Sequence, residues 1–223
     1  MNTADKLRAR NFDLLLRGAG KEQEVEITDG RIRVFGVPQN TIGTFSSVFC
    51  DEVYAFAAEE EYIVYDIGLN NGIAAQYYAG YKNVRRIYGF EPFPETFAVA
   101  EKNLAANPEP AAKIIAHNFG LGNRNEWREI SYNRELPGSM RPIVNRFDGQ
   151  GCAEKVNILD ASEVLAPLFE RHREKILLKM DCEGSEKEIV SSLSHSGLLG
   201  KVDAIVMEWH FNPPGYLTRQ LTK

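Results

Sequence analysis

The sequence has little of what marks several classes of protein. Its 223 residues contain three cysteines, Cys50, Cys152 and Cys182, which are too few and too far apart for a disulfide framework or a zinc pattern. No run approaches the about 18 apolar residues that a membrane-spanning helix needs. The first 17 residues mix charges of both signs and lack the apolar core of a signal peptide. We therefore expect a cytoplasmic protein without a membrane partner.

An excess of positive charge is also missing. Lys and Arg number 26 against 31 Asp and Glu, for a net charge of −5, whereas a nucleic-acid-binding protein gathers Lys and Arg on one face. We expect no nucleic-acid partner. The hydrophobic content of 43% is ordinary for a globular protein, and the length suffices for one domain with a full core.

The N-terminal part of the chain predicts a small unit of its own. In residues 23–36, apolar and polar side chains alternate on both sides of Asp29-Gly30, which predicts a β-hairpin with a two-residue turn. We expect a helix before this hairpin, a loop over residues 36–44, and helical spacing in residues 46–59. We therefore divide the chain into an N-terminal helix and hairpin, residues 1–45, and a main domain, residues 46–223.

The main domain alternates apolar runs of strand length with segments of helical spacing, which predicts βαβ units and a parallel sheet. The expected strands are 62–65, 86–91, 113–117, 175–180 and 202–207, and the expected helices are 72–80, 94–106, 160–171 and 185–193. We predict a Rossmann-like, doubly wound α/β sheet of order 3-2-1-4-5. Residues 124–159 are less regular, with Trp127–Tyr132 and Ile143–Phe147 as further strand candidates and Pro137–Ser139 as a turn.

Ligands of such sheets bind beyond the carboxyl ends of the strands, where the strand order reverses. After the first predicted strand, Gly68 can turn the backbone sharply and Gly72 lets the next helix approach closely. Glu91 ends the second strand and can accept hydrogen bonds from a ribose diol. A dinucleotide site would have glycine in place of Asn70 and no acid at Asp66, because a carboxylate repels a pyrophosphate. The same carboxylate suits the ammonium group of S-adenosylmethionine, although a glycine turn of this kind also occurs in non-catalytic α/β domains.

Three sequence blocks resemble the FkbM family of methyltransferases. They are VYDIGLNNG at 64–72, YGFEP at 88–92 and LKMDCEGSE at 178–186. The family is marked by a D-x-G-x-x-x-G turn, a following F-E-P and a late K-x-D-x-E-G-x-E, and the similarity extends from about residue 60 to residue 211. The resemblance implies S-adenosylmethionine as methyl donor and a hydroxyl of a sugar or secondary metabolite as acceptor.

The resemblance also implies which residues contact the cofactor. It assigns the methionine part to Asp66, Gly68, Asn70 and Gly72, the ribose to Glu91, and the surroundings of the adenine to Pro92, Phe93, Asn118 and Phe119. Packing in the core explains Phe119 equally well.

Methyl transfer to an alcohol needs a group that takes the hydroxyl proton, and two strand ends offer candidates. His210, three residues beyond the last strand, is our first choice because imidazole titrates near neutral pH, although a solvated loop histidine is the alternative. Asp181 can orient the acceptor, and Glu183 and Glu208 complete the catalytic group. Glu183 and Glu186 can instead simply stabilise a helix N-terminus. Lys179 lies in an apolar strand and is expected either to pair with one of these carboxylates or to reach the ligand crevice.

Several alternatives stay open in the sequence. Asp181, Glu183, Glu208 and His210 also suit a divalent metal, but their spacing fixes no coordination geometry, so we expect S-adenosylmethionine without a metal. An NAD-dependent oxidoreductase and a non-catalytic nucleotide-binding domain are the alternative functions. After the fifth strand only residues 211–223 remain, too short for the helix and strand pair usual in class I methyltransferases. C-terminal strands can therefore be missing, and an exposed sheet edge would permit a homo-oligomer.

Overall fold

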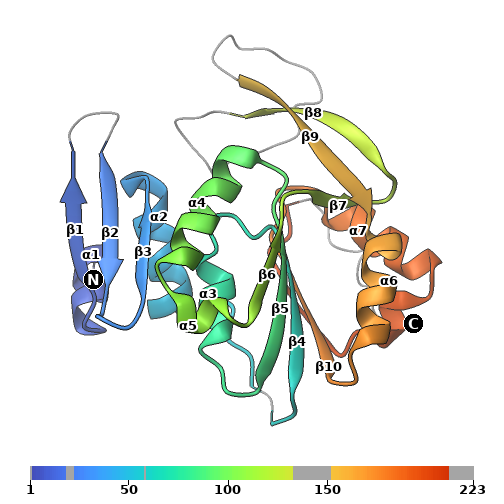
Figure 1. The fold of residues 1–223 in the computed structure, drawn as a ribbon, viewed down its shortest axis with the longest axis horizontal. Coiled ribbons are helices and arrows are strands. Elements are labelled where there is room, and N and C mark those ends of the chain that lie inside the picture. The colour runs from blue at the N-terminus through green and yellow to red at the C-terminus, as the bar shows by residue number, and fades with distance from the viewer. Residues whose placement is uncertain (1, 19–22, 58, 133–151, 211–223) are drawn as a thin grey trace.

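The computed structural model describes residues 2–18, 23–57, 59–132 and 152–210. Its central sheet has five parallel strands, which run in the order β11-β10-β4-β5-β6 (Figure 1). These strands are β4 (Tyr62–Ile67), β5 (Val84–Phe90), β6 (Ile114–His117), β10 (Lys175–Met180) and β11 (Ala204–Met207). The predicted Rossmann-like α/β class and the predicted order 3-2-1-4-5 are confirmed.

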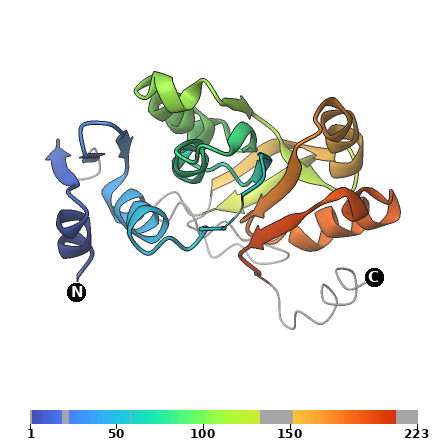
Figure 2. The same ribbon diagram turned by 90° about the horizontal axis from the view of Figure 1, so that it is seen from below.

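Helices cover both faces of this sheet (Figures 1 and 2). One face carries α3 (Ile73–Ala79), α4 (Pro94–Ala105) and α5 (Pro108–Ala111), and the other carries α6 (Ala161–Arg171), α7 (Glu186–His195) and a 3₁₀ turn, Leu198–Lys201. Strand β4 is buried along its whole length. Its Tyr62 and Val64 join the core cluster on the α3 side, whereas Ile63, Tyr65 and Ile67 join the cluster on the α6 side. This two-sided burial explains why the strand is apolar without alternation.

A second, smaller sheet lies above the carboxyl ends of the central strands (Figure 1). It has the order β7-β9-β8 and consists of β7 (Gly120–Gly122), β8 (Glu126–Tyr132) and β9 (Cys152–Asp160). The predicted strand at Trp127–Tyr132 is confirmed as β8, but β9 lies in a region that we expected to be irregular. The strand predicted at Ile143–Phe147 and the turn at Pro137–Ser139 lie outside the described residues.

The N-terminal unit begins with α1 (Thr3–Ala9) and continues with an antiparallel sheet of β1 (Asp13–Arg17), β2 (Glu24–Thr28) and β3 (Arg33–Gly36). The predicted hairpin is confirmed as β2 and β3. Its connection has four residues rather than two, since Thr28 pairs with Arg33 and the Asp29 side chain accepts hydrogen bonds from the backbone N–H groups of Arg31 and Ile32. Strand β1 was not predicted.

The segment after the hairpin differs from the prediction. Residues 38–45 form helix α2 (Pro38–Phe45) rather than a loop, because Pro38 occupies the first helical turn, where a proline is well tolerated. The helix continues as a π-helical turn, Ser46–Cys50, so the helix predicted for residues 46–59 ends early. Phe45, Val48 and Cys50 share an apolar cluster with Ile73 of α3. The division at residue 45 remains a prediction.

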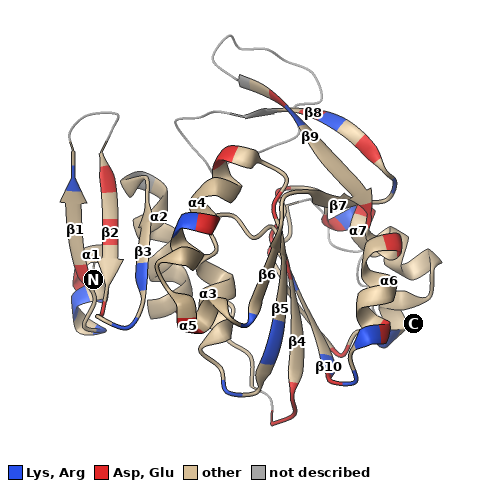
Figure 3. Ribbon diagram, viewed as in Figure 1, with Lys and Arg blue, Asp and Glu red and all other residues tan. Residues whose placement is uncertain are grey.

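Charged residues of both signs are spread over the described part of the chain, with no element of the picture coloured by one sign along its whole length (Figure 3). No described helix is both long enough and apolar enough to cross a membrane.

Candidate functional site

A cavity lies at the carboxyl ends of β4, β5 and β10, beneath the small sheet. Its walls come from the turns after these three strands and from the sheet above. They include Gly68, Asn70, Glu91, Pro92, Phe93, Gly120, Leu121, Ile130, Ile158, Asp181, Cys182, Glu183 and Ser185. The topology thus brings Gly68, Asn70, Glu91 and Pro92, predicted for the cofactor, together with Asp181 and Glu183, predicted for the acceptor.

Glu91 is held on the cavity wall by the backbone. Its side chain is buried, and its two carboxyl oxygens accept hydrogen bonds from the N–H groups of Asn70 at 2.9 Å and Phe93 at 3.0 Å. Burial raises the pKa of Glu91 to about 7, although these two hydrogen bonds act in the opposite direction. Each carboxylate oxygen has a further lone pair, so a ribose diol can still donate to this group.

The turn after β4 depends on glycine. Gly68 has a φ of +86°, and a Cβ atom there would lie 1.9 Å from the carbonyl oxygen of Asp181. The turn therefore packs directly against the end of β10, which only glycine allows. Gly72, with a φ of +78°, is the N-cap of α3 and lies close to Ala100 of α4. Gly72 does not line the cavity, so its role is to place the helix.

Asp66 lies beneath the turn rather than at its mouth. Its side chain is fully buried, does not line the cavity and pairs with Lys179 Nζ at 2.9 Å. The same Nζ donates a hydrogen bond to the carbonyl oxygen of Gly68 at 2.7 Å. Burial alone would lower the pKa of Lys179, but the charges of Asp66 and Asp181 raise it above its ordinary value. The partner of Lys179 is thus Asp66 rather than one of the acids that follow β10, and Asp66 reaches the turn after β4 through that lysine.

Asn118 and Phe119 do not line the cavity. The amide of Asn118 donates a hydrogen bond to the carbonyl oxygen of Glu91 at 2.9 Å, and Phe119 packs on Phe90 with the ring centroids 5.6 Å apart. The next residues of the chain, Gly120 and Leu121, supply the cavity wall instead. The structure therefore favours the packing interpretation of Phe119.

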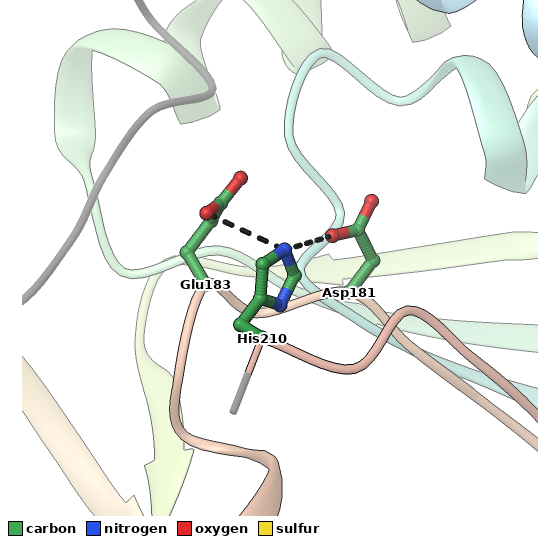
Figure 4. A group of neighbouring side chains, drawn as sticks. All are labelled: Asp181, Glu183 and His210. Atoms are coloured by element: carbon green, nitrogen blue, oxygen red, sulfur yellow. Dashed lines mark ion pairs between the residues drawn. The ribbon is translucent and has the colours of Figure 1, made fainter. Parts of the chain in front are cut away.

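The predicted catalytic residues form one cluster, and Figure 4 shows three of them; Asp181 and Glu183 line the cavity, whereas Glu208 and His210 do not. His210 Nε2 lies 3.8 Å from Asp181 Oδ1, 3.5 Å from Glu183 Oε2 and 3.7 Å from Glu208 Oε1. The other ring nitrogen, Nδ1, lies 2.8 Å from Glu186 Oε1. Burial raises the pKa of Glu183 to about 7, with the Asp181 and Glu208 charges adding to this and His210 opposing it. We call Asp181, Glu183, Glu208 and His210 the acceptor cluster.

The acceptor cluster has two further neighbours, and the sequence prediction missed one of them. Tyr54, from the segment before β4, donates a hydrogen bond to Asp181 Oδ2 at 2.7 Å. Glu186, which the sequence offered either as an acceptor-side acid or as an acid that stabilises a helix start, contacts His210. Tyr54 carries no motif, and its contact spans 127 positions of sequence, so no sequence signal identifies it. Glu186 was visible as the last acid of the third block.

Asp181, Glu183 and His210 also have the chemistry of a divalent-metal site. One ligand atom from each lies within 4.8 Å of the others, so small side-chain rotations would allow all three to contact one cation. Among the described residues, they are the candidate ligands that geometry identifies.

The fold and the cavity define the class: a Rossmann-like α/β protein with its ligand cavity at the strand-order reversal. The sequence model of the methyltransferase FkbM domain matches residues 66–221. The chain belongs to this family of methyltransferases, and a methyltransferase function follows from the membership.

The individual proteins that match this chain share low sequence identity with it. The AMB antimetabolite synthetase AmbE of Pseudomonas aeruginosa is 27% identical over 226 residues, which cover 84% of this chain but 10% of AmbE. Methyltransferase 1 of Beauveria bassiana is 24% identical over 185 residues, covering 72% of this chain and 70% of that protein. The crystal structure of a methyltransferase FkbM from Methylobacillus flagellatus shares 16% identity with a TM-score of 0.44, covering 72% of this chain and 36% of that one.

Proposed function

We propose that the chain transfers a methyl group from S-adenosylmethionine to a hydroxyl oxygen of a small molecule, a sugar or a secondary metabolite. The observation that carries this proposal is a single cavity whose wall includes Glu91 and Asn70 together with Asp181 and Glu183. A cofactor with a ribose and a reactive sulfonium methyl, together with an acceptor hydroxyl, needs these two kinds of group side by side.

On the cofactor side, Glu91 accepts hydrogen bonds from the ribose hydroxyls. The turn at Gly68 and Asn70 contacts the methionine part, and Asp66 and Lys179 hold that turn from below. Pro92 packs against the adenine, as do the apolar side chains that the small sheet contributes to the cavity wall, Ile130 and Ile158. Bound S-adenosylmethionine supplies an electrophilic methyl carbon, so the protein needs to add orientation rather than covalent chemistry.

On the acceptor side, Asp181 orients the hydroxyl and His210 acts as the general base. The hydroxyl oxygen forms the new bond to the methyl carbon while the carbon–sulfur bond breaks, and the hydroxyl proton passes to His210 Nε2. Glu208, together with Glu183 where the pH exceeds its raised pKa of about 7, places negative charge beside the ring, which stabilises the imidazolium that results. This chemistry needs no metal ion.

The first experiment is calorimetry of the full chain with S-adenosylmethionine and with NAD. We expect S-adenosylmethionine to bind and NAD not to bind. Binding of NAD alone would support an oxidoreductase, and binding of neither would support a non-catalytic domain. Transfer of a labelled methyl group is then measured on a panel of sugars and hydroxylated metabolites, with and without EDTA. Activity that EDTA abolishes and Mg²⁺ restores would overturn the metal-free mechanism.

A further inference from the structure

Glu186 is a buried acid that the cavity does not explain. It is the first residue of α7 and is 0% exposed, and it does not line the cavity. Its Oε1 atom lies 3.3 Å from the backbone N–H groups of both Cys182 and Gly184, and the helix N-terminus also favours its negative charge. The carboxylate is therefore fixed in place before any ligand binds.

The one side chain that this fixed carboxylate contacts within the acceptor cluster is His210, with 2.8 Å between Oε1 and Nδ1. A neutral imidazole has a single N–H, and a carboxylate beside one nitrogen draws the proton to that nitrogen. In a neutral ring, the closer partner on Nδ1 therefore favours the tautomer that leaves Nε2 without a proton.

The Nε2 atom has no comparable partner. Its three carboxylate neighbours are 3.5 to 3.8 Å away, which is longer than an ordinary hydrogen bond. Figure 4 shows this nitrogen turned toward Asp181 and Glu183, and both of these residues line the cavity. Within the described part of the chain, Nε2 thus has no partner at hydrogen-bond distance and lies beside two side chains of the cavity wall, although His210 itself is not part of that wall.

We propose that Glu186 is a positioning residue for methyl transfer: it holds the Nδ1–H of His210, so that Nε2 faces the acceptor without a proton. This proposal rests on the proposed function and adds to it a group that acts through another residue. Glu183, Asp181 and Glu208 surround the ring from the β10 and β11 ends, whereas Glu186 alone orients it from α7.

A purely structural role for Glu186 makes different predictions. The same carboxylate bonds to the turn between β10 and α7, so its removal could merely loosen that turn. Glu186→Gln should keep both roles, because a carbonyl oxygen in place of Oε1 still accepts from Cys182, Gly184 and His210; the protonated nitrogen of His210 and the separate effects on kcat and KM therefore distinguish the two roles. Glu186→Ala removes all three contacts. Glu188 supplies a matched control, since it lies in the same turn of α7 and pairs instead with Arg128 at 2.8 Å.

The kinetic test compares kcat and KM for these variants in the full chain, with the acceptor found in the panel. We expect Glu186→Ala to lower kcat roughly ten- to a hundredfold, part of the range that a general base supplies. The KM values and the Kd of S-adenosylmethionine should stay within about twofold. Glu186→Gln should recover most of kcat, and Glu188→Gln should match the wild type. A wild-type kcat in Glu186→Ala, or an equal loss in kcat and cofactor affinity, would overturn the proposal.

A spectroscopic test needs no acceptor and so stays informative if the proposed reaction is wrong. Nitrogen-15 NMR of the imidazole in EDTA, at a pH where the ring is neutral, should show His210 protonated on Nδ1 in the wild type. Glu186→Ala should shift the ring toward the other tautomer. Wild-type protonation on Nε2 would overturn the proposal, as would a Mg²⁺-induced shift of the Nε2 signal, which would make His210 a metal ligand. If Glu186→Ala does not fold, the wild-type and Glu186→Gln spectra still decide.

Discussion

The cavity wall contains two groups of residues that are held in different ways. We call Gly68, Asn70 and Glu91 the cofactor end, and Asp181 and Glu183, with the rest of the acceptor cluster, the acceptor end. At the cofactor end, backbone groups hold the essential side chain, since the N–H groups of Asn70 and Phe93 fix a buried Glu91. At the acceptor end, side chains hold one another, and the His210 side chain is 21% exposed. Backbone geometry is set by local sequence, whereas side-chain contacts can change at little cost to the fold. The comparison teaches that a single side-chain substitution should disturb the acceptor cluster more readily than it disturbs the setting of Glu91.

A buried polar network connects the two ends. Lys179 joins Asp66 and the Gly68 carbonyl on the cofactor side, and it lies 5.3 Å from the ring of Tyr54. Tyr54 in turn donates to Asp181 on the acceptor side. Lys179 of strand β10 therefore contacts the cofactor end directly and the acceptor end through Tyr54. Some substitutions near it should affect one end and others should affect both.

The largest expected effect is on catalysis alone. His210→Ala should lower kcat by roughly 10²- to 10⁴-fold, the usual contribution of a general base. The Kd of S-adenosylmethionine should barely change, because His210 contacts none of the residues at the cofactor end. Steady-state kinetics and calorimetry measure the two quantities, and His195→Ala, at the exposed end of α7, is the control. An equal loss of cofactor binding would reassign His210 and remove the separation between the two ends.

Loss of the buried lysine should affect both ends through stability. Lys179 is 3% exposed and Asp66 is fully buried, so Lys179→Met leaves a buried carboxylate without its cation. Removing one partner of such a pair costs about 3–5 kcal/mol, measured as the change in the free energy of unfolding in urea. Lys175→Met, which breaks the exposed pair with Asp203, should change it far less. Lys179→Met with Asp66→Asn should recover part of the loss, and no recovery would contradict the pairing.

The sequence predicted the parts of this molecule that local rules control. The strand order follows from βαβ connections, and the turn after β4 follows from Gly68, whose positive φ and close approach to Asp181 leave no room for another residue. The chemistry of Glu91 followed in the same way, because it ends a strand beside that turn.

The parts that escaped prediction depend on long-range contacts. Asp66 was placed at the cavity because sequence cannot show that Lys179, from a strand over a hundred residues later, turns it inward. Helix α2 was read as a loop from its Gly, Pro and Thr content, although Phe45 is buried and stacks on Phe49 at 4.4 Å. Packing of this kind overrides local propensity.

A smaller effect, confined to the cofactor end, should come from Glu91. Ribose hydroxyls need the ionised carboxylate as acceptor, and burial raises its pKa to about 7. Affinity for S-adenosylmethionine should therefore be full above this pH and fall as the pH drops, by on the order of tenfold between pH 8 and pH 6. Calorimetry at several pH values measures this. Glu91→Gln should bind about tenfold more weakly at pH 8 and without that pH dependence, whereas Glu101→Gln, exposed on α4, should behave as the wild type. A pH-independent Kd in the wild type would argue against ribose contact.

The smallest effect should spare both ends of the cavity. The side-chain amides of Asn103 and Asn107 bond to the backbone N–H and C=O groups of Phe35 and Arg33 at the free edge of β3. Asn103 lies in α4 and Asn107 just beyond its end, and the two amides face alternate residues of the strand, which lie about 6.6 Å apart.

Asn107→Ala removes one of these two amide bridges, and water can reach the partly exposed groups of Arg33 that it leaves. We therefore expect a loss of about 1 kcal/mol in the free energy of unfolding, faster hydrogen exchange at the Arg33 amide, and unchanged kcat and cofactor affinity. A clear change in either catalytic quantity would show that the N-terminal unit contributes to the cavity. The contrast between the two ends would then have to include a third region.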